Sequence, residues 1–462
     1  MLGAKHWSWS ALLWPLVLLL VAAIPSISLS QPSTIVVNAS VHVHEGVASC
    51  AGSTCHGRPV ASGLVVRQNE LLTWQDPSSP AGAHSRAWRV LTEPRAQAIA
   101  AKLGLDSPQS APACVGCHVD PVSARWRGAT FQVSDGVGCE ACHGGSGDWI
   151  ASHTDVAATH ADNVARGMVP LENPRVRAAV CLDCHSGGGD ERQFATHRLM
   201  AAGHPRLSFE LDLFSALQRH YDIDADYVRR KPVAGGVKTW AVGQATALER
   251  VLTLYADAGR GQNGVFPEFS FFDCHSCHRA ISDDPKVRLT VMANPGRPIP
   301  IGTPPFNDEN MIMLSAAVQT AAPSLAPRLA ADSRAFHAAI PLGRSEAANA
   351  ARRLAATAHA LSSAFAGQSF QRAETFAILQ NVLSDPTAAR YTDYAGAAQA
   401  VMAADTLLTA LADAGEVSPA AVAQMRPDVE LAYQAVRDPN SFRYEDFRRS
   451  LQRIAADVRA LR

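Results

Sequence analysis

The sequence has no large excess of charge of either sign, since 41 Lys and Arg residues stand against 42 Asp and Glu residues. This balance excludes a basic protein that binds nucleic acid through an excess of positive charge. The chain is not poor in apolar residues, which make up 47% of it, and this excludes a disordered tail. Ten cysteines in 462 residues are too sparse for a small disulfide scaffold. The length instead predicts about two to three structural units, at roughly 150 residues each.

After residue 30 the sequence contains no apolar run long enough to cross a membrane. Before it, Lys5 is followed by an apolar stretch over residues 11–24 and by small residues at Ser28 and Ser30. This pattern is typical of a cleaved export signal, so residues 1–30 are predicted to be a signal peptide. The mature protein is then expected to be periplasmic or otherwise exported. An uncleaved membrane anchor over the same stretch is the alternative.

No cysteine lies outside a close pair, and a histidine follows each pair at once. In an exported protein an even number of cysteines favours disulfides, but this pattern instead indicates covalent attachment of c-type haem. A zinc site would use two such pairs for one ion and would leave the histidines unexplained. The predicted haem-binding cysteines are Cys50, Cys55, Cys114, Cys117, Cys139, Cys142, Cys181, Cys184, Cys274 and Cys277.

The spacing of the pairs has a chemical reason. In a turn of helix, cysteines three residues apart project from the same side, and both can form thioethers with one porphyrin. The next residue lies four positions from the first cysteine, on the same face, and its imidazole can reach the iron. The cofactor is therefore predicted to be haem c, five copies covalently attached, with the iron ligands His56, His118, His143, His185 and His278.

The first pair differs from the others, because four residues separate Cys50 from Cys55 and the chain between them must bulge. A disulfide between these two cysteines, with haem at four sites only, is the alternative. The immediate His56-Gly57 favours haem.

Four stretches resemble the multihaem cytochrome c family related to the tetrahaem cytochrome c-554 of ammonia oxidation: residues 49–57, 136–144, 202–207 and 267–278. The resemblance covers roughly residues 45–300. It implies an exported electron carrier built mainly of helices and loops around closely stacked haems. The chain departs from the four-haem pattern by its fifth pair, at Cys274, and by a long C-terminal extension.

An electron-carrying haem iron usually has a second axial ligand, and the mature chain has eleven histidines outside the motifs. The resemblance implies His84, His153 and His204 as such ligands, because they lie in stretches similar to the family's ligand-bearing ones. His197 and His160 are the next candidates, and a surface or helix-capping histidine is the equal alternative for both.

Of the remaining spare histidines, His220 has no predicted role. His42 and His44 alternate with valines in a strand-like segment over residues 34–43, which favours a solvated strand face, with iron ligation as the alternative. His275, His337 and His359 are expected to have structural roles.

Arginines crowd the cysteine-rich part, and guanidinium groups match carboxylates in geometry. Most of them are predicted to bind haem propionates, with surface solubility as the alternative: Arg125, Arg127, Arg175, Arg177, Arg192, Arg198 and Arg206.

The predicted fold class is mainly α, in two parts. Residues 31–305 are expected to form a five-haem cytochrome c domain of short helices and loops, in which the motifs follow one another so closely that the porphyrins replace an aliphatic core. Residues 306–462 lack cysteine, are rich in alanine and show helical periodicity, which predicts an α-helical bundle. Helices are expected over residues 93–103, 207–220, 238–256, 311–321, 346–365, 370–383, 395–414, 418–436 and 440–461.

The sequence therefore predicts an exported pentahaem c-type cytochrome that transfers single electrons between redox partner proteins, such as a membrane quinone enzyme or another cytochrome. Nucleic acid is not an expected partner, and the oligomeric state is left open. The alternative is a multihaem reductase or oxidase acting on nitrite, hydroxylamine or a sulfur oxyanion at a haem with an open axial position. The typical five-haem nitrite reductases have Lys in place of one motif histidine, whereas all five are His here. An electron-transfer protein is the preferred interpretation.

Overall fold

The computed structural model describes residues 42–60, 68–260, 268–278, 297–300, 303–439 and 441–461. The predicted signal peptide and residues 34–41 of the strand-like segment lie outside this part of the chain. Residues 35–462 belong to one compact unit.

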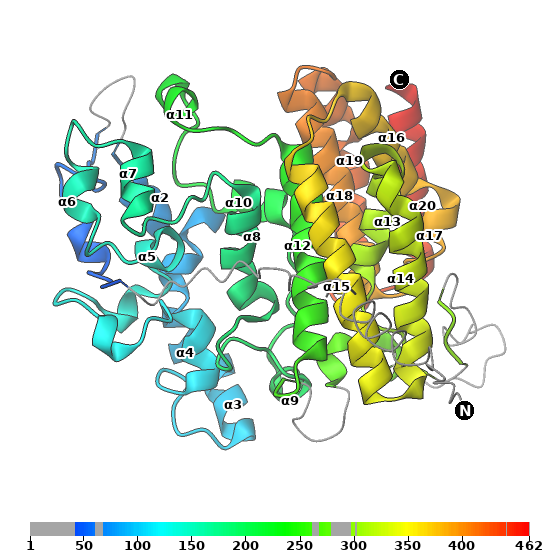
Figure 1. The fold of residues 1–462 in the computed structure, drawn as a ribbon, viewed down its shortest axis with the longest axis horizontal. Coiled ribbons are helices and arrows are strands. Elements are labelled where there is room, and N and C mark those ends of the chain that lie inside the picture. The colour runs from blue at the N-terminus through cyan, green and yellow to red at the C-terminus, as the bar shows by residue number, and fades with distance from the viewer. Residues whose placement is uncertain are drawn as a thin grey trace, which may run out of the picture. The chain divides into compact units, whose positions relative to one another are not determined.

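The described residues are mainly helical, which confirms the predicted fold class (Figure 1). Extended pairing in them is limited to two isolated β-bridges, between His44 and Arg127 and between Phe272 and Phe306. The second bridge holds the fifth cysteine motif beside the segment that leads into the C-terminal helices.

The cysteine-rich part consists of short helices separated by turns. Prolines set the starts of several of them, because a proline in the first turn leaves no helical hydrogen bond unmade. The α-helices are α2 (Glu70–Gln75), α3 (Pro94–Leu103), α4 (Pro112–His118), α5 (Cys139–His143), α6 (Ile150–His153), α7 (His160–Ala165), α8 (Pro174–Leu182), α9 (His197–Ala202), α10 (Leu211–Leu217) and α11 (Ala225–Arg230). The shorter turns are η2 (Val47–Ser49), η3 (Pro80–Gly82), η4 (His84–Arg86), η5 (Arg89–Thr92), η6 (Ala124–Trp126), η7 (Val133–Asp135), the π-helical η8 (Asp183–Gly187), η9 (Phe269–Phe271) and η10 (Cys274–Ser276).

Apolar packing within this part is sparse. Two small clusters are found among its described residues, one around Leu91 and Ala111 and the other around Leu182 and Leu211. A segment of this length normally buries a continuous core. Groups other than aliphatic side chains must therefore fill the interior of the cysteine-rich part.

Longer helices follow, and they share one large apolar core. They are α12 (Gly236–Ala256), α13 (Glu309–Ala321), η12 (Pro323–Leu325), α14 (Ala326–Ala339), η13 (Ile340–Leu342), α15 (Arg344–Ala366), α16 (Arg372–Leu383), α17 (Asp385–Ala388), α18 (Tyr394–Asp413), α19 (Pro419–Ala435) and α20 (Tyr444–Ala460).

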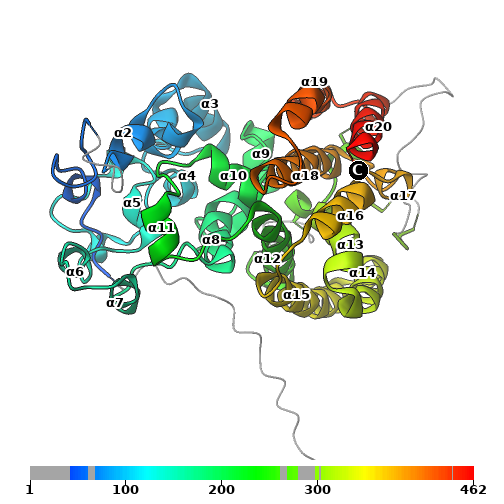
Figure 2. The same cartoon turned by 90° about the horizontal axis from the view of Figure 1, so that it is seen from above.

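Helix α13 lies at the centre of this bundle. Its residues Met311, Ile312, Met313 and Leu314 are consecutive and all buried, so the helix is apolar on every side. In Figure 2 it lies among α12, α14, α16 and α18, and it packs against all four. Among the described helices, α18 is long and apolar enough to span a membrane, but 83% of its apolar window is buried inside the protein.

Helix α12 belongs to both parts of the fold. One side packs against α8, η8 and α10 of the cysteine-rich part, and the other packs along α15 and against α13 and α18 (Figure 1). Its Trp240, Ala241 and Val242 are completely buried. Gly243 allows the close approach to α10, because a Cβ there would lie 2.5 Å from the Cβ of Leu211.

The predicted helices agree with α3, α12, α13, α15, α16, α18, α19 and α20 to within four residues at each end. Helix α10 is shorter than its predicted span of residues 207–220. Helix α14 was not predicted, because Pro323 and Pro327 at its start interrupt the helical periodicity of the sequence. Pro327 lies in the first turn of α14, where proline is tolerated.

The buried carboxyl group of Glu210 caps the N-terminus of α10 and connects this helix to the bundle. It is 1% exposed, and it accepts hydrogen bonds from the backbone nitrogens of Asp212 and Leu213 and from Thr406 Oγ1 of α18. Burial raises the pKa of Glu210 to about 7.

Replacing Glu210 by Gln should remove part of the pH dependence of stability. The folded protein holds a proton on this group up to about pH 7, whereas the unfolded chain releases it near pH 4.5, so wild-type stability falls as the pH rises through this window. At about 1.4 kcal/mol per unit, Glu210→Gln is expected to gain on the order of 3 kcal/mol relative to wild type between pH 4.5 and pH 8. Denaturant unfolding at a series of pH values measures this difference.

The matched control is Glu430→Gln, because Glu430 is exposed on α19. Its stability should follow that of wild type at every pH. Curves for Glu210→Gln that also run parallel to wild type would contradict the assignment.

Candidate haem sites

Four of the five cysteine motifs are built on single turns of helix. Helix α5 begins at Cys139 and ends at His143, and α4 ends at His118. In the fourth motif the chain passes from α8 into the π-turn η8, a deviation that often marks functional sites. In the fifth, η10 begins at Cys274, and the backbone nitrogen of His278 donates to the carbonyl of Cys274.

The first motif closes by turns in place of a helix. The backbone nitrogen of Cys55 donates to Gly52 O over 2.8 Å, and that of His56 donates to Cys50 O over 3.1 Å. Gly57 is required, because a Cβ there would lie 2.1 Å from Ala51 O. All ten cysteines are free in this structure, so the disulfide considered for Cys50 and Cys55 is not formed.

Each motif histidine faces a second histidine from a distant segment. The five ring pairs have centroid separations of 5.9 to 6.4 Å and join residues 77 to 101 positions apart. The pairs are His56 with His153, His118 with His204, His143 with His220, His185 with His84, and His278 with His197.

This separation fits one metal ion between two imidazoles. Metal–nitrogen bonds of about 2 Å on opposite sides of an ion place the two ring centroids about 6 Å apart. The rings are too far apart for direct van der Waals contact across their faces, and they belong to the residue type that binds haem iron. The five pairs therefore fit axial ligation of five haem irons.

The second-ligand candidates differ in where the structure places them. His84, His153, His204 and His197 each lie opposite a motif histidine. His160 does not lie in one of these ring pairs, and its Nε2 is 2.9 Å from Glu172 Oε1.

The histidine opposite His143 is His220, which the sequence analysis left unassigned. It lies three residues beyond the end of α10, in a segment without a motif. The available signal was numerical, because five predicted haems call for five second ligands and His220 is one of the eleven spare histidines. Its place in the fold could not be read from neighbouring residues.

The expected solvated face at His42 and His44 is wrong for His44, which is completely buried. Its Nδ1 lies 2.7 Å from Asp120 Oδ2, two residues beyond His118. His42 forms a similar contact of 2.6 Å with Asp148. The buried pair joins the segment before the first motif to the second motif.

Three other histidines lie against residues of the bundle or its approach. His275 donates from Nε2 to Pro439 O, and His359 Nδ1 is 3.0 Å from Glu249. His337 Nε2 is 3.4 Å from Asp308 Oδ2.

Several paired histidines have the Nδ1 atom engaged, which leaves Nε2 to face the partner ring. His118, His204 and His220 have Nδ1 within 2.7 to 3.2 Å of the backbone carbonyls of Ala87, Pro205 and Gln218. Such contacts fix the tautomer that binds metal through Nε2.

Burial keeps most of these imidazoles uncharged. It lowers the pKa of His143 to about 3 and that of His185 to about 4, and it also lowers the pKa values of His84, His204 and His220. Neutral imidazole is the form that binds a metal ion. His56 differs, because its hydrogen bond with Glu70 raises its pKa.

The motifs pack against one another in pairs. The side chains of Cys50 and Cys139 lie close enough for each to shift the pKa of the other, and so do those of Cys117 and Cys184. The first motif thus lies beside the third, and the second lies beside the fourth.

Glu140, inside the third motif, stabilises the first of these contacts. Its carboxylate is buried and accepts three backbone N–H bonds of 2.7 to 2.8 Å, from Glu45, Gly46 and Ser146. Glu45 and Gly46 lead directly into η2 and the first motif. One side chain therefore fixes the segment before the first motif against the third.

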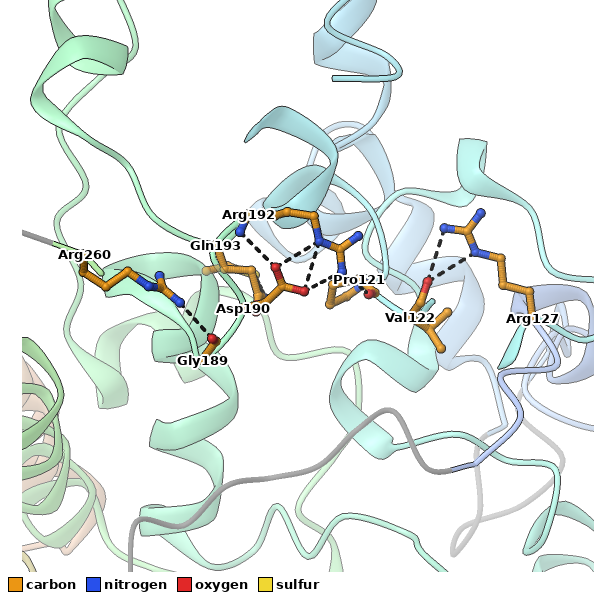
Figure 3. Close-up of polar contacts among 9 residues, drawn as sticks. Pro121, Val122, Arg127, Gly189, Asp190, Arg192, Gln193 and Arg260 are labelled. Carbon is orange, nitrogen blue, oxygen red and sulfur yellow. Dashed lines mark hydrogen bonds and ion pairs between the residues drawn. The ribbon is translucent and has the colours of Figure 1, made fainter. Parts of the chain in front are cut away.

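Figure 3 shows three arginines that bind groups of the protein in segments shortly after the second and fourth motifs. Arg192 binds Asp190 through Nε at 2.9 Å and donates to Pro121 O, while Arg127 donates to Val122 O. Arg260, beyond α12, donates to Gly189 O. Arg127 and Arg192 thus have protein partners, and the prediction of propionate binding stays untested.

Other donors in this region lack protein partners. The Nε1 atoms of Trp88, Trp126 and Trp149 and the Nε atoms of Arg175 and Arg177 are buried without a hydrogen-bond acceptor. Buried donors are normally satisfied, so these atoms fit an acidic group that the chain does not itself provide. Haem propionates are such groups.

Arginines outside the motifs also contact two of them. Arg250 of α12 forms an ion pair with Asp183, between the cysteines of the fourth motif, and donates to Gly187 O over 2.8 Å. Arg206 donates to Cys274 Sγ of the fifth motif over 3.0 Å. In the described part of the chain, no group of three or more His, Cys, Asp and Glu side chains is arranged to hold a metal ion by itself.

Helical turns that present two cysteines and a histidine define a c-type cytochrome, a protein of electron transfer. Within this class, residues 49–144 match the family model described as cytochrome c554 and c-prime, and the chain resembles that family. The match includes the first three motifs and His84, whereas the fourth and fifth motifs and the helical bundle lie outside it. No curated protein and no solved structure matches the chain.

Gly116, inside the second motif, is predicted to be needed for the close packing of this motif against Arg192. A Cβ at this position would lie 2.5 Å from Arg192 O and 2.7 Å from Arg192 Cβ. Gly116→Ala should therefore lower the free energy of unfolding by about 1–3 kcal/mol, the usual cost of overpacking. Denaturant unfolding of the purified protein measures the loss.

The matched control is Gly189→Ala, because nothing lies within 4 Å of a Cβ placed there. Equal stabilities for the two variants would show that Gly116 does not pack against Arg192 as described.

Proposed function

We propose that the protein is an exported pentahaem c-type cytochrome that transfers single electrons between redox partners. The observation that carries this proposal is the set of five histidine pairs, each joining one motif histidine to one distant histidine at about 6 Å. Each bound haem supplies an iron that accepts and returns one electron.

The protein's own residues attach, orient and shield these groups. The cysteine pairs would hold the porphyrins covalently, and each histidine pair would supply two ligands to an iron, so that a substrate would find no free site there. Backbone carbonyls hold the tautomers of His118, His204 and His220. A ligand set that does not change with oxidation state suits reversible transfer.

Contacts between motifs support a continuous path. Cys50 and Cys139 affect each other's pKa, as do Cys117 and Cys184, so the first site lies beside the third and the second beside the fourth. His84, of the fourth pair, lies close enough to His220, of the third, for the charge of His220 to lower the pKa of His84. Gln193 donates to Cys184 Sγ, and the next residue, Phe194, has its ring 5.6 Å from that of Phe271, which leads into the fifth motif.

The pairs favour a carrier over the alternative of a reductase or oxidase. Catalysis on nitrite, hydroxylamine or a sulfur oxyanion requires an iron with one axial position open. In this proposal all five irons have two histidines, His278 included. Export rests on the apolar segment before residue 30, and the partners proposed are another cytochrome or a membrane quinone enzyme.

The haem count and ligation can be tested on the protein purified from a host that matures c-type cytochromes. Intact mass should show five additions of roughly 0.6 kDa each, and spectra should show low-spin iron that does not bind carbon monoxide, nitrite or hydroxylamine. Four additions would return Cys50 and Cys55 to another role. A high-spin iron that binds these molecules would make the enzyme the better interpretation.

His220→Ala should open one axial position. About one fifth of the iron is expected to become high-spin and to bind carbon monoxide, because His143 would lose its opposite ligand. His160→Ala is the matched control and should leave all five irons low-spin, since His160 lies against Glu172. Absorption and electron paramagnetic resonance spectra measure both variants, and the reverse pattern would exchange the roles of the two histidines.

A further inference from the structure

The first histidine pair differs from the others in the acceptor that its motif histidine contacts. His56 Nδ1 lies 3.0 Å from the carboxylate oxygen Oε2 of Glu70. The acceptors for His118, His204 and His220 are neutral backbone carbonyls. Among the ring contacts described for the ten paired histidines, the Glu70 carboxylate is the one negatively charged acceptor.

The local structure holds Glu70 in this place. Glu70 is the first residue of α2, and the next backbone nitrogen, that of Leu71, donates to His56 O over 3.0 Å. The backbone nitrogen of Arg58 donates to Gln68 O over 2.8 Å. Gln68 has a φ of 58°, a left-handed conformation that residues other than glycine rarely adopt. The turn into α2 is thus fastened to both sides of Gly57, directly after His56.

A carboxylate acceptor changes the chemistry of a histidine ligand. When Nδ1–H donates to an anion, Nε2 becomes more basic and binds the more positive state of a metal more strongly. Hydrogen bonding around a haem iron is one of the means by which proteins set its reduction potential. The charge of Glu70 acts in the same direction, because an anion nearby favours oxidised iron.

We propose that Glu70 is a positioning residue that lowers the reduction potential of the haem held by Cys50 and Cys55. This inference rests on the proposed function, since it requires a haem at the first site with His56 and His153 as ligands. Its consequence is directional. An electron at the first site is held less tightly than it would be without Glu70, which favours its passage to the third site, whose Cys139 lies near Cys50.

The test compares Glu70→Gln with Glu172→Gln. Gln keeps the shape of the side chain and removes its charge in both variants. Glu172 is a close control, because it also contacts a histidine, His160, at 2.9 Å, and that histidine lies outside the five pairs. Spectroscopic redox titration of each holoprotein at one pH, with electron paramagnetic resonance of the oxidised iron, gives the potentials and the ligand field.

Glu70→Gln should raise one of the five potentials and leave four unchanged. The ratio of reduced to oxidised haem at that site is expected to increase about tenfold at a given applied potential, which for one electron corresponds to about 59 mV. The low-spin signal of the same haem should shift. His153→Ala, which removes the opposite ligand, identifies which signal belongs to the first site.

Two results would overturn the proposal. In one, Glu70→Gln leaves all five potentials unchanged; in the other, Glu172→Gln produces an equal shift, which would mark a general effect of charge. Failure of the proposed function looks different, because wild-type protein would then lack a fifth haem by mass or contain high-spin iron. Glu70→Asp provides a further measurement if Glu70→Gln attaches fewer haems. The Asp variant keeps the charge but not the reach, so its first-site potential should lie above that of wild type, and an unchanged value would also overturn the proposal.

Discussion

The separation between paired imidazole rings is the constraint on which the cysteine-rich part depends. Each pair requires that two histidines 77 to 101 residues apart in the sequence hold their ring centroids about 6 Å from one another. Few aliphatic side chains are buried there to set such distances. In the proposed holoprotein the haems fill the space between the rings, so the cofactors act as core and as functional groups together.

Polar contacts hold the motifs in place in a part of the chain where apolar packing is sparse. Glu140 accepts hydrogen bonds from three backbone N–H groups and so connects the third motif to the segment before the first. The buried pair of His44 and Asp120 connects that segment to the residues just after the second motif. Buried carboxylates are costly unless each oxygen is satisfied, and the partners of Glu140 are fixed backbone groups. Glu70 belongs to the same kind of contact, with the difference that it touches a histidine of one of the five pairs.

The helical bundle contacts and supports the cysteine-rich part. Its core is continuous with α12, and through Arg250 that helix holds Asp183 of the fourth motif. Just before the fifth motif, Phe272 forms a β-bridge with Phe306, and His275 inside the motif donates a hydrogen bond to Pro439 O. An aliphatic core on one side of α12 thus gives a rigid support to a part of the chain that has little aliphatic core of its own.

The sequence by itself determined what is local. Cysteine and histidine positions within one turn define the motifs, and a period near 3.6 residues defines most helices of the bundle, because both depend on contacts three and four residues apart. Only the tertiary structure decided that His220 faces His143 whereas His160 faces Glu172, that His44 is buried, and that α12 joins the bundle. These features depend on contacts between segments that are distant in the sequence. The residues that flank a single histidine therefore do not indicate which side chain lies opposite it in the folded protein.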